Sequence, residues 1–500
     1  MILAYGEGDI NSYSFDPHRT LSNLLTAWRT WRSPHLPAEQ PDSAPDVLVI
    51  GGGAAALCAA ITARRAGCSV LLAEQAPLAH RGGNTRHSRN LRLSHPAPTP
   101  FTSGVYHADE FWAELDRATE GTADPNLGRL LVEHSATLTD WLLEAGVPLQ
   151  PRSSGVLPES RRTAFLLGGG KTLLNRLYAL AERLGVRIWY DCEISAPQLE
   201  DGRIVHLTAQ HAHTSYPLTP RTVIACCGGG QANRAWLRQQ WGAVADGFIN
   251  RGTPFATGTL LASLLQQGAL AVGDPRAAYL VAVDARSPAD DGGIVTRVRS
   301  MPEGIVVDTS GRRRHDEGGD TASTRYALWG QRLAHWPEQL GYLILDARGQ
   351  RAAPPALYPP IQAPTLAALA ALLGIDSAAL CATVADYNAA IRPAAAEHAS
   401  GYTVGLDPPK TRHAQPLTEP PFSAYPMRPG ITFTYYGVAV DTRTRVRLAA
   451  GGVIENLFAA GMLMAPNLMA RGYVSGLALT IGLVFGRLAG AEAARGVHSG

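Results

Sequence analysis

The first clear segment of patterned hydrophobicity begins at Asp46, where DVLVI is a continuous apolar run. Such a run is typical of a parallel strand that is buried on both faces. It is followed by the glycine turn GGGAAA, a helix of small residues to Ala66, and a second apolar run, VLLAE, that ends at Glu74. Strand, turn, helix and strand within about thirty residues predict a βαβ unit.

Later segments continue this α/β pattern. Helical periodicity covers 108–118, 125–145, 171–185 and 366–373, and a long last helix begins near Leu477. Apolar runs predict strands at 186–190, 221–225 and 456–460, with a hairpin at Asp201-Gly202. Residues 276–425 contain more proline, and we expect short strands there. Alternating strands and helices predict an α/β fold with a doubly wound, Rossmann-like sheet.

Residues 1–45 are only weakly patterned. They contain one predicted helix, over 21–31, and then the proline-rich stretch PHLPAEQPDSAP. We interpret this arm as an extension that ends in a linker. Its aromatic and basic side chains, such as Trp28 and Arg29, would suit either a partner or packing against the main body.

The composition excludes two broad classes of protein. The 500 residues are 46% hydrophobic and 17% charged, with 44 Lys+Arg against 42 Asp+Glu. A disordered chain would be less hydrophobic and would carry more net charge. A net charge of 44 − 42 = +2 also argues against nucleic-acid binding, because neutralising phosphates requires clustered surplus cations. The length exceeds what one core usually holds and predicts more than one domain.

Cysteine spacing and apolar runs indicate the compartment. The six cysteines include no C-x-x-C pair and have no histidine at ligand spacing, so we expect neither a disulfide framework nor zinc. The opening MILAYGEGDINSYSF lacks the features of a signal peptide. The apolar stretch near 476–484 is expected to be too short to span a bilayer. We therefore predict a cytoplasmic protein without an integral membrane segment.

The first glycine turn has the form G-x-G-x-x-A. Gly51 permits the sharp turn, Gly53 lets the backbone approach a pyrophosphate, and Ala56 permits close contact between helix and strand. The helix N-terminus offers free N–H groups to the anion. Glu74 ends the second strand, 74 − 51 = 23 residues after Gly51, where a carboxylate can accept hydrogen bonds from ribose. This context predicts a dinucleotide site, the alternative being a glycine turn without a ligand.

Two other glycine-rich segments differ in what they predict. RGGNTRHSRN, at 81–90, would place flexible backbone, hydroxyl and amide groups beside the dinucleotide, and its arginines could meet phosphates or an anionic substrate. The alternative is a solvated basic loop. GGGKT, at 168–172, fails the phosphate-loop pattern because Phe165 stands where that pattern needs glycine. We interpret it as a glycine turn that caps a helix.

DVLVIGGGAAALCAA, LLAEQ, RGGNTRH, ACCGGG and GLALTIGLVFGRLAG occur in this order. Together they resemble the fumarate reductase/succinate dehydrogenase flavoprotein superfamily. RGGNTRHSRNLR, INRGTPFATG, GRRRHDEG and FTYYGVAVD are most similar to its tricarballylate dehydrogenase-like branch. The resemblance covers about residues 45–495.

The resemblance implies FAD, held in a doubly wound domain with an inserted α+β capping domain. It divides the chain into an extension at 1–44, an FAD-binding domain at 45–275 and 426–500, and a cap at 276–425. The relatives that bind flavin covalently use a histidine near the position of Asn84, so we predict non-covalent FAD. The expected cofactor-binding residues are Gly51, Gly53, Ala54, Ala55, Ala56, Glu74, Gln75, Arg81, Gly82, Gly83, Asn84, Thr85, Arg86, Glu193, Gly228, Gly229, Gly461, Ser475, Gly476 and Leu477.

The resemblance also implies a set of catalytic groups. Arg471 precedes the last helix, where the family keeps a substrate arginine, and arginine holds a carboxylate bidentately. Arg325 and Arg332 follow the segment that carries the family's proton-delivery groups, and Glu317 would be the relay acid. The alternative for each arginine is a surface or ion-pair role.

Departures from the family pattern argue against fumarate or succinate as the substrate. FTYYG lacks the family's histidine, and a second family histidine falls near Tyr279. Tyr435 and Tyr436 could donate hydrogen bonds to the substrate, or they could be core aromatics. His315 beside two acids makes a poor metal site, and we expect no metal.

Three functional hypotheses follow. The first is an FAD-dependent dehydrogenase or reductase that exchanges a hydride between flavin N5 and a carbon beside a carboxylate or carbonyl. The second is an oxygen-using flavoprotein that modifies a larger metabolite, such as a precorrin-type macrocycle. The third is a flavin-stabilised interaction protein that recruits a partner through its arm. With one dinucleotide fingerprint, electrons should pass through a separate iron–sulfur or quinone-linked carrier, or oxygen, and the chain would be peripheral to a membrane at most.

Overall fold

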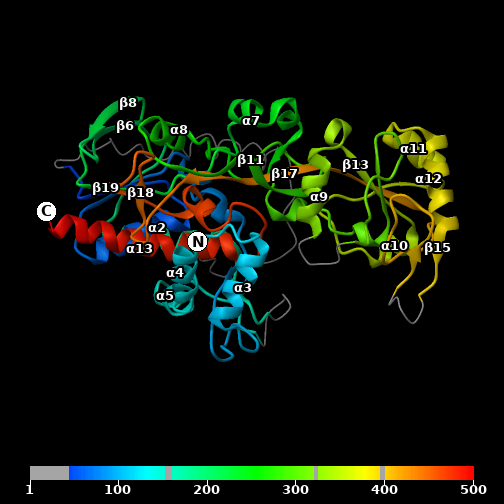
Figure 1. Cartoon of the computed structure of the whole chain (residues 1–500), viewed down its shortest axis with the longest axis horizontal. Helices are drawn as coiled ribbons and strands as arrows, with labels where there is room; N and C mark the ends of the chain where they lie inside the picture. The colour runs from blue at the N-terminus through cyan, green and yellow to red at the C-terminus, as the bar shows by residue number, and fades with distance from the viewer. Residues whose placement is uncertain (1–43, 153–159, 320–324, 395–399, 500) are drawn as a thin grey trace, which may run out of the picture. The chain divides into compact units, whose positions relative to one another are not determined.

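The computed structural model describes residues 44–152, 160–319, 325–394 and 400–499 (Figure 1). Residues 44–500 form one compact unit. The predicted extension, with its helix over 21–31, lies outside the described residues.

A six-stranded sheet contains the predicted βαβ unit. Its order is β18-β19-β9-β1-β2-β5, and all neighbours are parallel except β18 and β19. Its strands are β1 Val47–Ile50, β2 Val70–Ala73, β5 Arg187–Trp189, β9 Thr222–Ala225, β18 Arg445–Arg447 and β19 Val453–Ala459. The four residues of β1, β2 and β9 are all buried, which explains their continuous apolar runs. The doubly wound sheet is therefore confirmed.

Helices cover this sheet. Figure 1 shows α13, Leu477–Ser499, lying along α2, Ala54–Arg65. These two helices contact β1, β9 and β19. The other helices of this part of the chain are α3 Ala108–Ala118, α4 Pro125–Ser135, α5 Leu138–Glu144, α6 Gly169–Arg183, α7 Arg234–Trp241 and α8 Thr259–Gln266.

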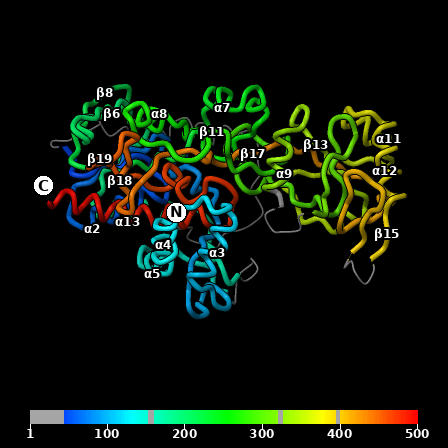
Figure 2. The backbone as a smooth tube through the Cα atoms, in the orientation of Figure 1, coloured from blue at the N-terminus to red at the C-terminus, as the bar shows by residue number. Residues whose placement is uncertain are grey.

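A second sheet is built around one long strand. The order is β10-β17-β13-β12, and β11 and β14 also pair with β17. Its strands are β10 Ile249–Asn250, β11 Ala271–Asp284, β12 Ile305–Asp308, β13 Gly341–Leu345, β14 Ile361–Ala363 and β17 Phe422–Val438. The helices α9 Arg325–Ala334, α10 Ala347–Ala352, α11 Leu366–Leu373 and α12 Ser377–Ala390 belong to the same part of the chain. In the tube view, β11 and β17 run from the first sheet toward β13 (Figure 2).

Smaller sheets complete the described fold. A three-stranded sheet has the order β6-β7-β8, with β6 Cys192–Glu200, β7 Arg203–His211 and β8 Thr214–Leu218. The turn between β6 and β7 is the predicted hairpin at Asp201-Gly202. Two-stranded sheets pair β3 Asn90–Arg92 with β4 Thr163–Phe165, and β15 Ile391–Arg392 with β16 Tyr402–Thr403.

One prediction of secondary structure was wrong. The helix expected over 125–145 is two helices, because the hydroxyls of Ser135 and Thr137 donate to the carbonyls of Val132 and His134 and compete with the helical pattern. The short strands expected in 276–425 are present as β12 to β16. The two strands that cross the ends of this range, β11 and β17, are longer than the sequence predicts, with 14 and 17 residues. Prolines and bulges hide both from a sequence pattern.

The predicted domain division, at 275/276 and 425/426, stays a prediction. Both positions fall inside strands, β11 and β17, rather than in linkers. The polypeptide runs from one sheet to the other within these two strands. No change of secondary structure therefore marks either of the predicted boundaries.

The last helix is longer than the expected apolar stretch. Within the described residues, α13 is the one helix that is long and apolar enough to cross a membrane, and 78% of its most apolar window is buried inside the structure. That burial is typical of the core helix of a folded domain.

Glycines on α13 permit its close approach to α2. A Cβ at Gly486 would lie 2.4 Å from the Ala55 carbonyl oxygen, and one at Gly490 would lie 2.4 Å from that of Ala59. Backbone oxygens cannot move aside as side chains can, so these positions require glycine. The contact fixes α2, and with it the turn at its N-terminus.

We expect Gly486→Ala to lower the free energy of unfolding by about 1–3 kcal/mol, because the added methyl forces the helices apart. Urea denaturation measures the change. The control is Gly496→Ala on the same helix, where a Cβ meets only Thr222 Cγ2 at 3.5 Å. That variant should be neutral or slightly stabilising, since alanine favours helix more than glycine does. Equal destabilisation by both variants would contradict the packing argument.

Candidate functional site

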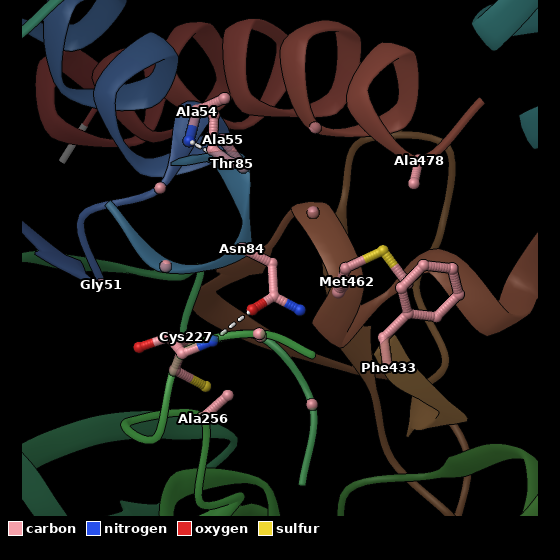
Figure 3. Close-up of a pocket in the computed structure, with 18 of the residues that line it drawn as sticks. Gly51, Ala54, Ala55, Asn84, Thr85, Cys227, Ala256, Phe433, Met462 and Ala478 are labelled. Atoms are coloured by element: carbon pink, nitrogen blue, oxygen red, sulfur yellow. Dashed lines mark hydrogen bonds between the residues drawn. The ribbon is translucent and has the colours of Figure 1, made fainter. Parts of the chain in front are cut away.

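A large cavity opens where the parallel strands end. It is lined by residues that follow β1, β2 and β9, by the start of α13, and by residues of β11 and β17 (Figure 3). Ligands of open α/β sheets bind outside the carboxyl ends of the strands, at this kind of crevice.

The first glycine turn forms one wall of the cavity. Gly51 has φ +109°, and a Cβ there would lie 2.5 Å from the Cys226 carbonyl oxygen. A Cβ at Gly52 would lie 2.2 Å from Glu74 Oε2. The turn therefore requires glycine at both positions, and its backbone faces the cavity without side chains.

The N-terminus of α2 faces the same cavity. Gly53 is the N-cap and no side chain caps the helix through it. The amide of Ala54 donates to Thr85 Oγ1 at 3.0 Å, the contact drawn in Figure 3. Ala55 also lines the cavity. A helix N-terminus with small residues, whose N-cap glycine has no side chain to cover it, is suited to a phosphate group.

Glu74 reaches the cavity from the end of β2. It is 5% exposed, and it accepts hydrogen bonds from the amides of Ala76 and Gly82, both at 3.0 Å. Burial raises the pKa of this carboxyl above its usual value. A buried carboxyl with lone pairs facing the cavity can accept hydrogen bonds from ribose hydroxyls.

The segment that follows β2 also lines the cavity. RGGNTRH folds into the 3-10 helix η2, Gly83–His87, so it is not a solvated loop. Asn84 Oδ1 accepts from the Thr253 amide at 2.8 Å, and its Nδ2 donates to the Thr432 carbonyl at 2.6 Å. Asn84 thus ties the first sheet's crevice to β17.

The start of α13 closes the far end. Gly476 has φ +83°, and a Cβ there would lie 2.7 Å from the Arg92 amide nitrogen. Ser475 Oγ accepts from Asn90 Nδ2 at 3.0 Å. Both residues line the cavity, so the N-terminus of a second helix faces it.

Most of the expected cofactor residues line this one cavity. They are Gly51, Gly53, Ala54, Ala55, Glu74, Gln75, Gly83, Asn84, Thr85, Glu193, Gly228, Gly229, Gly461, Ser475 and Gly476. The others support it from outside. Gly82 donates to Glu74, and Ala56 and Leu477 are buried in the core. Arg81 donates to the Tyr190 hydroxyl at 2.8 Å, and Arg86 lies 3.3 Å from Asp291.

Those residues expected to be catalytic whose side chains the structure describes do not line the cavity. Arg471 is 56% exposed and pairs with Glu120 at 2.7 Å. Glu317 is fully buried in an ion pair with Arg313, at 2.6 Å, and also accepts from the Val306 amide. That geometry makes it a structural group of the second sheet.

The remaining predicted groups also have structural contacts. Arg332 donates to the Asp316 carbonyl at 3.3 Å, and the Arg325 side chain lies outside the described residues. Tyr435 is buried and donates to the Gly472 carbonyl, and burial raises its pKa. Tyr436 stacks on Trp236 with ring centroids 6.1 Å apart. None of the described members of this set lines the cavity.

Sequence reasoning gave no role to Arg251, Arg297 or Phe433, which do line the cavity. Arg251 and Arg297 come from the segments after β10 and β11, and Tyr279 and Phe433 from β11 and β17. The phrase INRGTPFATG contains Arg251, but it gave no sign that this arginine faces a ligand. Among the described residues, no group of three or more metal-ligating side chains could hold a metal ion.

His87 is a further titratable group of the cavity. Its Nε2 lies 2.6 Å from Asp291 Oδ1, and burial lowers its pKa below the usual value. Gly293 packs against this ring, because a Cβ there would lie 2.5 Å from His87 Nδ1. A neutral ring held by a carboxylate through one nitrogen can accept a proton on the other.

These features fit a flavin dinucleotide. Two helix N-termini and a glycine turn would hold its phosphates and flavin edge, and Glu74 its ribose. The family model described as "FAD binding domain" matches residues 46–474. The chain belongs to this family, and the expected FAD is confirmed.

Named relatives agree with this assignment. The chain is 27% identical, over 483 residues, to "NADH:fumarate oxidoreductase" of Klebsiella pneumoniae, covering 91% of this chain and 48% of the relative. It thus spans about half of that relative. Its fold is similar to "the open conformation of a flavocytochrome c3 fumarate reductase", with TM-score 0.73, 22% identity, and coverage of 99% of this chain and 83% of that one.

A steroid-active enzyme shares the fold as well. The "3-ketosteroid-delta4-(5alpha)-dehydrogenase from Rhodococcus jostii RHA1" has TM-score 0.67 and 23% identity, over 92% of this chain and 98% of that one. The chain is therefore a flavoprotein of the FAD binding domain family, and it is similar to fumarate reductases in sequence and in fold. The tricarballylate dehydrogenase-like branch stays a prediction.

We expect FAD to be released when the protein is denatured, because Asn84 carries no nucleophilic nitrogen. Acid precipitation followed by absorbance of the supernatant measures this. All flavin should appear in the supernatant, and flavin that remains with the protein pellet would show a covalent bond. A protein reconstituted with FAD in excess is the reference for full loading.

Proposed function

We propose that the protein transfers a hydride between FAD and a carbon atom beside a carboxylate or carbonyl of an anionic substrate. Bound FAD supplies the hydride acceptor or donor, at N5 of its ring. The observation that carries the proposal is that Arg251 and Arg297 line the same cavity as the dinucleotide-binding residues.

Arg251 is suited to hold the substrate's anionic group. It is 4% exposed, and its Nη1 donates to Thr432 Oγ1 at 2.6 Å while its Nε donates to the Gly293 carbonyl at 3.3 Å. These bonds fix the guanidinium at the cavity wall. Arg297 is fixed through Nε, which donates to the Ile294 carbonyl at 2.9 Å. A guanidinium stays charged when it is buried and polarises the bonds next to a carboxylate.

His87 is the group we assign to the proton. In the dehydrogenation direction, one carbon of the substrate loses a hydride, which carries the electron pair of the C–H bond. The neighbouring carbon loses a proton, and a double bond forms between the two carbons. Nδ1 of neutral His87 accepts this proton, and Asp291 stabilises the charged ring through Nε2. In the reduction direction the same atom returns the proton.

The finer assignments belong to this proposal as well. A tricarballylate-like acid suits the two cavity arginines. An oxygen-using flavoprotein acting on a larger metabolite is the second candidate, and the aromatic residues Tyr279 and Phe433 in the cavity wall favour it. Electrons would reach FAD through a separate carrier or oxygen, and the fold is shared with a flavocytochrome. The cytoplasmic location and the interaction-protein hypothesis, which rests on residues 1–44, stay predictions.

We expect a carboxylic acid from an anaerobic screen to bleach the absorbance of bound FAD. Arg251→Gln should slow that bleaching by about 10-fold to 100-fold, because a lost charged hydrogen bond costs about 1.5–3 kcal/mol. FAD content should not change. Arg238→Gln, on the exposed surface of α7, is the control. Bleaching lost with Arg471→Ala but kept with Arg251→Gln would return the substrate role to Arg471.

We expect the rate of substrate dehydrogenation to rise with pH as His87 loses its proton, with an inflection below the ordinary histidine value. Burial lowers the pKa of His87, so the neutral ring that accepts the proton persists to lower pH. Asp291→Asn removes the carboxylate that raises this pKa, so the inflection should move to still lower pH while the maximal rate falls. Stopped-flow bleaching across pH 5–9 measures both, roughly the range in which histidine titrates. An unchanged profile in His87→Gln would exclude His87.

A further inference from the structure

Three aromatic rings pack against one another in the wall of the cavity. Tyr279 stacks on Tyr473 with ring centroids 4.3 Å apart and an interplanar angle of 26°. It also stacks on Phe433, at 5.2 Å and 23°. All three residues line the cavity, and Figure 3 draws Phe433 there.

The three rings differ in exposure. Tyr279 is 6% exposed and Phe433 is 4% exposed, while Tyr473 is only half-buried. Tyr279 therefore supports one face of Tyr473, and Tyr473 is the most exposed of the three rings. A rigid aromatic surface of this kind stacks favourably with a flat, conjugated ligand.

The aromatic face lies beside the cation that we assign to the substrate. Tyr279 and Phe433 are register partners on β11 and β17. Arg251 directly follows β10, which pairs with the other edge of β17, and it bonds to Thr432. Neighbouring strands are about 4.8 Å apart. The backbone of Arg251 therefore lies about one strand spacing from that of β17, which carries Phe433, and about two from that of β11, which carries Tyr279.

This arrangement matches a ligand with unlike ends. Arg251 donates to the Gly293 carbonyl and Arg297 to the Ile294 carbonyl, so one segment holds both cavity arginines. A small dicarboxylate needs a cation at each end, but the position two strands from Arg251 carries a tyrosine ring. Acidic side chains do line the cavity, as Glu74 and Glu193, but they come from β2 and β6 rather than from the strands beside Arg251. The aromatic end thus offers stacking, and the Arg251 end offers positive charge.

We infer that the substrate is a carboxylate joined to a flat, conjugated ring body, with the carboxylate at Arg251 and the ring against Tyr473. The inference rests on the proposed function, and it concerns the substrate class of the same site. The double bond that gains or loses hydrogen lies between the two ends, beside the carboxylate.

Equilibrium dialysis of the FAD-loaded, oxidised chain against trans-cinnamate and against fumarate tests it. Both probes carry a double bond next to a carboxylate, but only cinnamate carries a ring. We expect cinnamate to bind at least tenfold more tightly than fumarate. Tyr473→Leu should weaken cinnamate about tenfold and leave fumarate unchanged, whereas Tyr473→Phe should keep the affinity for cinnamate. Tyr358→Leu, on a loop outside the cavity, is the control.

Three results would overturn the inference. The first is that fumarate binds as tightly as cinnamate, and the second is that neither probe binds. The third is that Tyr473→Leu and Tyr473→Phe each weaken the binding of both probes equally. FAD content is measured in each variant, so a folding defect is recognised. Binding does not require turnover. Cinnamate that binds as expected without any acid bleaching the flavin would leave the substrate class intact and remove the hydride-transfer proposal.

Discussion

The close approach of backbone to backbone around α2 is the constraint on which the site depends. On one side, Gly51 lies against the Cys226 carbonyl at the end of β9. On the other side, Gly486 of α13 lies against the carbonyl of Ala55. With no side chains at these contacts, α2 is held with its N-terminus open to the cavity. A larger residue at either contact would move the helix and the amides it presents.

The second sheet adds the substrate half of the site to this cofactor half. Asn84 connects the two, since one side-chain amide bonds to Thr253 and to Thr432. β17 then places Thr432, which fixes Arg251, next to Phe433. His87 meets Asp291 across the same junction. The groups that we assign to substrate binding and proton transfer therefore come from both sheets and depend on how these sheets meet.

The sequence allowed the fold and the cofactor residues to be predicted more completely than the catalytic residues. The cofactor residues could be predicted because they are local: turn, helix N-terminus and acid lie within one βαβ unit, whose order along the chain fixes their order in space. The catalytic assignments stay predictions, and the described ones have contacts outside the cavity. Glu317 forms a buried ion pair with Arg313, four residues before it in the sequence. Arg471 precedes α13, but its side chain turns to the surface and to Glu120.

The sequence by itself determined the doubly wound sheet, the glycine turn and the FAD site, because apolar runs and small residues at fixed spacing act over one or two elements. Only the tertiary structure decided which arginine, histidine and aromatic residues face the cavity. Arg251, His87 and Tyr279 are far apart along the chain, and strand pairing between β10, β11 and β17 brings two of them together. Such pairing depends on long-range packing, which no local pattern of residues encodes.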